Sequence, residues 1–177
     1  MNKKKSIYFV AQAAIIAAVY AVLTIGQNFL IPGSASLAVQ VRVSEALCAL
    51  CILSPAAIPG VTIGCVLSNI TTINVMPLDM VFGSLATLIA AVLMYRFRNI
   101  RVKNIPVLSL LMPVIFNALI IGAEITLFIP SDSGVTLTGF IIQALLIAAG
   151  ELISVFIFGI PLMKAMEKVN IFKKYQT

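Results

Sequence analysis

Apolar residues fall into six runs along the chain, separated by short segments rich in polar residues, proline or glycine. The runs cover residues 7–25, 43–53, 56–70, 78–97, 107–129 and 137–163. A helix needs about 20 mostly apolar residues to cross the hydrocarbon core of a bilayer. The pattern predicts an all-α integral membrane protein, built as a bundle of about six transmembrane helices.

The second and third runs, 43–53 and 56–70, are too short for a full upright crossing. Lipid cannot hydrogen-bond an exposed peptide group. We therefore expect these two helices to be tilted, or to have their irregular ends covered by protein or facing a water-filled cavity.

Composition supports the membrane assignment. Hydrophobic residues make up 61% of the 177 residues and charged residues 10%, and the mean hydropathy is +1.12. Soluble domains carry about 25% charged residues. We expect a single membrane domain over residues 1–177, with cytoplasmic ends at 1–5 and 165–177.

The cations predict the orientation of this domain. Eleven of the 12 lysines and arginines lie before the first run, from the last two residues of the fourth run to the start of the fifth, or after the sixth. Because lysine and arginine accumulate on the cytoplasmic side, both termini are expected in the cytoplasm of a multi-pass protein of the cell membrane. The net charge of +6 is explained by contact with the lipid bilayer and its anionic headgroups, and no nucleic-acid partner is needed. The eleven residues are Lys3, Lys4, Lys5, Arg96, Arg98, Arg101, Lys103, Lys164, Lys168, Lys173 and Lys174.

Arg42 is the exception, and with this topology it lies at the outer end of the second run. Glu45 follows three residues later, so both side chains project from nearly one helical face. Carboxylates inside a membrane cost about 2.5 to 3.5 kcal/mol each on insertion scales and usually line a cavity, a pathway or an ion pair. Four acids against one arginine in the outer half favour bound cations, protons or a substrate rich in N–H donors. The candidate substrate-binding residues are Arg42, Glu45, Asn69, Asp79, Asn117, Glu124, Gln143 and Glu151.

Purely structural roles are the alternative to substrate binding for several of these residues. Arg42 and Glu45 can form an ion pair with each other, and Asn69 and Asn117 can hydrogen-bond between helices. Gln143 is open to either interpretation. No aromatic platform for a ligand stands out in the outer half, where Phe29, Phe82, Phe116 and Phe128 are equally compatible with core packing.

The sequence gives little support for catalysis or for metal binding. The chain has no histidine, which removes the usual general base and the commonest metal ligand. Cys48 and Cys51 form a Cys-x-x-Cys, but Cys65 is the only other thiol, so we interpret all three as small apolar fillers rather than a zinc site. We expect no catalytic residue, no metal, no cofactor and no enzymatic activity.

Small residues form a strip on the first run, with alanines spaced four apart. Such spacing lets another helix approach closely where lipid supplies no hydrophobic drive. The strip is either an internal packing face or a docking surface for a partner protein, and its residues are Ala14, Ala17, Ala18 and Ala21.

Several stretches carry a family resemblance over most of the chain. RVSEAL (42–47), IPGVTIGCVLSN (58–69), LDMVFGSLATLIAA (78–91), FNALIIGAE (116–124) and GEL (150–152) resemble the QueT family of queuosine-precursor transporters. The small size and the number of runs are similar to those of the substrate-binding S component of an energy-coupling factor (ECF) transporter. The resemblance is weakest at 26–40 and 129–138.

The resemblance implies uptake of a 7-deazaguanine such as queuine or 7-aminomethyl-7-deazaguanine. It also implies partners, namely an ECF module of one transmembrane coupling protein and two cytoplasmic ATPases that docks on the alanine strip. No G-x-x-x-x-G-K-[ST] motif occurs in the chain, which agrees with nucleotide hydrolysis by partners. Three alternatives stay open: an S component for a vitamin, a stand-alone proton-coupled carrier of purine-like bases, and a structural membrane protein without a ligand.

Overall fold

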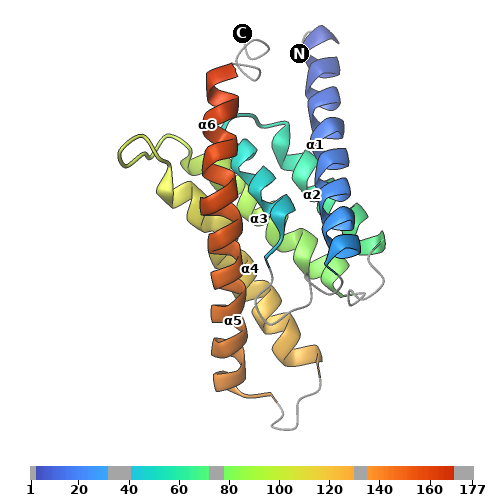
Figure 1. The fold of residues 1–177 in the computed structure, drawn as a ribbon, viewed down its shortest axis with the longest axis vertical. Coiled ribbons are helices and arrows are strands. Elements are labelled where there is room, and N and C mark those ends of the chain that lie inside the picture. Colours follow the sequence, from blue (N-terminus) through green and yellow to red (C-terminus); the bar gives the residue numbers. More distant parts are fainter. Residues whose placement is uncertain (1–2, 32–40, 72–77, 130–134, 170–177) are drawn as a thin grey trace.

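The computed structural model describes residues 3–31, 41–71, 78–129 and 135–169, which form an all-helical bundle (Figure 1). Four helices are long and apolar enough to cross a membrane, and two shorter apolar helices lie among them. The predicted all-α class and the six helical segments are therefore confirmed, and four of the six segments in the described ranges are long enough to be membrane spans. The elements are α1 (Lys3–Leu30), η1 (Val43–Ile52), α2 (Ala57–Thr71), α3 (Asp79–Phe97), α4 (Val107–Phe128), α5 (Leu137–Leu152), η2 (Ile153–Gly159) and α6 (Ile160–Val169), of which the last three form one continuous helix.

Two helix ends lie beyond the predicted limits. The sixth run was expected to end near residue 163, but α6 continues to Val169, so part of the expected cytoplasmic end is helical. The first run was expected to stop at Gly26, but α1 continues through it to Leu30. A single glycine costs a helix only about 1 kcal/mol. The last turn is also held by Gln27, whose side chain accepts from the Val43 N–H and donates to the Val41 carbonyl.

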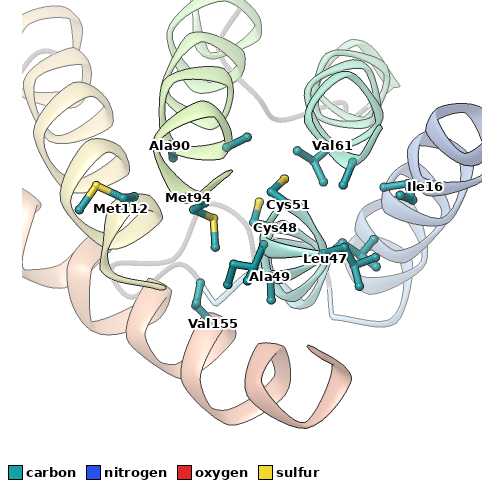
Figure 2. Close-up of a cluster of buried hydrophobic side chains, with 14 of the residues drawn as sticks. Ile16, Leu47, Cys48, Ala49, Cys51, Val61, Ala90, Met94, Met112 and Val155 are labelled. Atoms are coloured by element: carbon teal, nitrogen blue, oxygen red, sulfur yellow. The ribbon is translucent and has the colours of Figure 1, made fainter. Parts of the chain in front are cut away.

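The short second run forms a 3₁₀-helix, η1, at the centre of the bundle. It packs against α1, α2, α3, α4, η2 and α6, and every residue from Ser44 to Ile52 is buried. The predicted covering of this short segment by protein is therefore confirmed. Because a 3₁₀-helix rises about 2.0 Å per residue and an α-helix about 1.5 Å, this winding lets ten residues extend roughly 20 Å through the bundle. Figure 2 shows side chains from the surrounding helices gathered around Leu47, Cys48, Ala49 and Cys51 of η1.

The long last helix contains a π-helical segment, η2, directly before Pro161. Proline lacks an N–H group, and its ring clashes with the carbonyl four residues earlier, so a regular α-helix is disfavoured at this point. The widened segment packs on η1, where a Cβ added to Gly159 would lie 3.3 Å from the Ala49 Cβ and 3.4 Å from the Ala46 carbonyl. The two irregular helices therefore meet in the core.

Helices α1 and α2 approach closely through two glycines spaced four apart. A Cβ at Gly60 would lie 2.9 Å from the Ala13 carbonyl, and one at Gly64 would lie 2.6 Å from the Tyr20 Cβ. This is the small-residue packing that brings helix backbones together in membranes.

The basic residues gather at one end of the bundle, which we call the basic end. The start of α1 and the end of α6 lie there together (Figure 1). The connection between α3 and α4 contacts α6 through an ion pair of Arg101 with Glu167 at 2.8 Å. Apart from Arg42, all lysines and arginines in the described ranges lie at or near this end. Lys173 and Lys174 fall outside those ranges.

Candidate functional site

A polar recess lies between η1, α3, α4 and α5, in the half of the bundle away from the basic end. Thr87 lies eight residues after Asp79, the first residue of α3. The recess therefore lies roughly 12 Å along the helix from the Asp79 end. The recess is narrow, so a bound ligand has to part its walls. Its lining residues are Arg42, Glu45, Gly83, Thr87, Asn117, Ile121, Ile147 and Glu151.

Arg42 forms its ion pair with Asp79 and not with Glu45. Its Nη2 lies 3.0 Å from the Asp79 Oδ2, and both residues are buried. The alternative of a structural ion pair between Arg42 and Glu45 is therefore not the arrangement found. The i, i+3 spacing does align the two side chains on a 3₁₀-helix, but the start of α3 brings a better-placed carboxylate to the guanidinium. The Arg42 Nε is buried and has no hydrogen-bond partner among the described residues.

Asp79 is held in place by neighbours on α2 and α3. The Asn69 amide donates to the Asp79 backbone carbonyl at 3.0 Å, so Asn69 joins two helices. A Cβ at Gly83 would lie 2.7 Å from the Asp79 Oδ1, so only glycine leaves this carboxylate its space. Asn69 and Asp79 support the recess from the Arg42 side and are not among its lining residues.

Glu45 accepts hydrogen bonds at both carboxyl oxygens. The Tyr20 hydroxyl donates to its Oε1, and the Cys48 thiol donates to its Oε2 at 3.1 Å. Cys48 is therefore more than the apolar filler that the sequence predicted. Cys51 and Cys65 are buried free thiols, and the described residues contain no cluster of metal-ligating side chains.

Asn117 and Glu151 meet across α4 and α5. The Asn117 Nδ2 donates to the Glu151 Oε1 at 2.7 Å. The remaining acceptors of the pair, the Asn117 Oδ1 and the Glu151 Oε2, are buried, and the described part of the chain offers them no hydrogen-bond partner. Both residues line the recess, so the pair brings two free acceptors to it.

Two predicted site residues lie farther from the recess. Glu124 is buried on α4, seven residues after Asn117 and on the same face. Neither of its carboxyl oxygens has a hydrogen-bond partner within the ranges that the structure describes. Gln143 is half-buried on α5, one turn before Ile147. Neither residue is among those lining the recess.

The sequence interpretation missed a polar stripe on α1. Tyr20, Thr24 and Gln27 share one face, and Thr24 donates to the Ser44 hydroxyl at 2.7 Å. Three polar residues at i, i+4 and i+7 in an otherwise apolar span were the available signal. The stripe holds the first turns of η1 against α1.

None of the four candidate phenylalanines lines the recess. Phe82 and Phe128 stack on each other with ring centroids 6.1 Å apart, Phe116 packs against the hydrophobic core, and Phe29 is 84% exposed. The apolar surface of the recess comes instead from isoleucines of α4 and α5, Ile121 and Ile147.

The alanine strip divides between two faces of α1. Ala17 is buried and its carbonyl faces Gly64, and Ala21 is half-buried. Ala14 and Ala18 point away from the bundle and are exposed. Part of the strip is thus an internal packing face, and part remains open to a neighbour.

Ionisable groups buried inside an apolar helical bundle commonly mark the substrate and ion pathways of transport proteins. The model of one such family, the QueT transporters, matches residues 10–168, and the chain belongs to the QueT transporter family. The protein is therefore a transport protein and not an enzyme. No curated protein and no solved structure gives a significant match.

Proposed function

We propose that this protein is the substrate-binding S component of an ECF transporter and that it imports a queuosine precursor. The expected cargo is a 7-deazaguanine, such as queuine or 7-aminomethyl-7-deazaguanine. Membership of the QueT transporter family supports a transport role, and the similarity of the sequence stretches given above supports the cargo.

The observation that carries the proposal is the excess of carboxyl groups around the recess. Arg42 is the only buried cation among the described residues, and Asp79 pairs with it. Glu45, Glu124 and Glu151 have no cation partner there. A cargo rich in N–H donors, or one with a cationic amine, can bond to such groups, whereas an anionic cargo would be repelled.

The described helices agree with an S component in two further respects. The exposed Ala14 and Ala18 offer a smooth surface for the coupling protein of an ECF module. With the basic end on the cytoplasmic side, as we propose, the recess would lie toward the outer half of the cell membrane, where it could receive an external substrate. The two ATPases of the module would supply the energy.

A ligand survey of the detergent-purified protein tests the cargo. Calorimetry with 7-deazaguanines, thiamine and riboflavin is expected to give binding only for the 7-deazaguanines. Binding of a vitamin in their place would reassign the protein to vitamin uptake.

A second experiment tests the need for partners. Uptake in cells is expected to require the ECF module and ATP. Uptake without these partners that follows the proton gradient would identify a stand-alone carrier, a role for which the unpartnered Glu124 carboxyl would be suited.

A further inference from the structure

Three polar atoms with no hydrogen-bond partner among the described residues lie on side chains that line the recess and are more than nine-tenths buried. They are the Nε of Arg42, the Oδ1 of Asn117 and the Oε2 of Glu151. Buried polar atoms are normally hydrogen-bonded, and each one left alone costs about 1 to 3 kcal/mol. Three such atoms around one recess therefore point to a ligand that supplies their partners.

The chemistry of each atom is fixed by its neighbours. The Arg42 Nε can only donate. With Glu151 ionised its carboxylate can only accept, so Asn117 turns its NH₂ group toward Glu151, which leaves the amide oxygen as an acceptor. The recess thus offers one donor and two acceptors.

The geometry points to a ligand edge with one acceptor and two donors, the arrangement of a carbonyl, a ring N–H and an exocyclic amine on a 2-amino-4-oxopyrimidine ring. The Arg42 Nε–H donates to the carbonyl, while Asn117 and Glu151 together accept from the ring N–H and the amine. The narrow walls, with Ile121 and Ile147 as their apolar part, suit a flat ring. This assignment rests on the proposed function and adds to it the three residues that select the ring.

Glu45 has a different role in this scheme. Both of its oxygens already accept from Tyr20 and Cys48. It therefore positions the η1 wall rather than reading the ring edge, although it lines the same recess.

Calorimetry with three ligands tests the assignment on the unmodified protein. They are 7-deazaguanine, 7-deazahypoxanthine, which lacks the 2-amine, and 7-deazaadenine, which lacks the 2-amine and has an amine in place of the carbonyl and an acceptor nitrogen in place of the ring N–H. Loss of a hydrogen bond to a charged group commonly weakens binding about 10- to 100-fold. We expect 7-deazahypoxanthine to bind weaker than 7-deazaguanine by this factor and 7-deazaadenine to bind weaker still.

The Glu151→Gln variant then tests whether Glu151 hydrogen-bonds to the edge of the ligand ring. Glutamine keeps the size of the side chain and can still accept from Asn117, but it turns an N–H toward the ligand. The ratio of 7-deazaguanine to 7-deazaadenine affinity is expected to fall about tenfold or more. Glu167→Gln, the same change at the basic end, is expected to leave this ratio unaltered.

The outcomes separate this inference from the proposed function. The assignment is overturned if Glu151→Gln leaves the ratio of 7-deazaguanine to 7-deazaadenine affinity unchanged, or if the unmodified protein binds the three ligands equally. In either case, binding of 7-deazaguanine still upholds the proposed function. Binding of a pterin, which carries the same edge on another skeleton, without binding of any 7-deazaguanine upholds the edge assignment and overturns the proposed cargo. Because the ligand series needs no substitution, a variant that fails to fold does not remove the test.

Discussion

Arg42 donates to Asp79 across 3.0 Å, and this ion pair ties the start of η1 to the start of α3. The chain places these residues 37 positions apart, at the ends of two helices that meet beside the recess. A buried pair of this kind contributes modest net stability, but loss of one partner leaves an uncompensated charge. The pair therefore fixes the position of the guanidinium that faces the recess.

Substitution Asp79→Asn is expected to lower the free energy of unfolding by about 3 kcal/mol, because it leaves the buried Arg42 charge without its partner. Denaturant unfolding of the protein in detergent measures this change. Glu167→Gln removes a carboxylate from the partly exposed Arg101 ion pair and is expected to cost less than about 1 kcal/mol. Equal losses in the two variants would show that the Arg42–Asp79 pair has no special role.

Substitution Gly64→Ala is expected to destabilise the protein by about 1 to 3 kcal/mol, because the new Cβ would lie 2.6 Å from the Tyr20 Cβ. The matched variant Gly26→Ala meets no atom within 4 Å and lies in the same pair of packed helices. It is expected to be neutral or to stabilise α1 by up to about 1 kcal/mol. Thermal unfolding compares the two, and equal transition temperatures would contradict the close α1–α2 contact.

The helical segments and the basic end could be predicted because they depend on local properties, namely the length of apolar runs and the positions of lysine and arginine. The winding of η1 could not, because an apolar run looks the same whether its peptide groups bond three or four residues back. The π-helical segment had one local signal, Pro161 inside a long apolar run.

The same distinction between local sequence properties and packing applies to the candidate site. Buried acids and amides were visible because charge is rare in an apolar span, but their partners depend on which helices pack together. Asp79 reaches Arg42 only because α3 begins beside η1, and Tyr20 reaches Glu45 only because the glycines of α2 hold α1 close. Such contacts cannot be read from spacing within one helix.

Glu124 is expected to recognise a cationic group on the cargo. It shares a face of α4 with Asn117 and Ile121, and both of its oxygens lack a partner. Under the proposed function, Glu124→Gln should weaken binding of 7-aminomethyl-7-deazaguanine about tenfold or more, because it removes a charge-assisted hydrogen bond. The affinity for 7-deazaguanine, which has no amine at this position, should change much less. Calorimetry measures both, and equal losses would assign Glu124 to the common ring or to folding instead.

Enlarging the exposed part of the alanine strip is expected to separate transport from binding. Ala14 and Ala18 point away from the bundle, so Ala14→Trp with Ala18→Trp should block the close approach of a coupling protein without reaching the recess. ATP-driven uptake in cells should be lost, while the purified variant binds its ligand with near-normal affinity.

The buried neighbour Ala17 provides the control for this experiment. Its carbonyl faces Gly64, so Ala17→Trp should force α1 away from α2 and disturb the hydrogen bond from Tyr20 to Glu45. That variant should lose stability and ligand binding together with uptake. If the Ala14/Ala18 variant behaves like Ala17→Trp, the strip serves only internal packing; if it transports normally, the partner docks on another face. Only loss of uptake with ligand binding retained supports docking on the face of α1 that points away from the bundle.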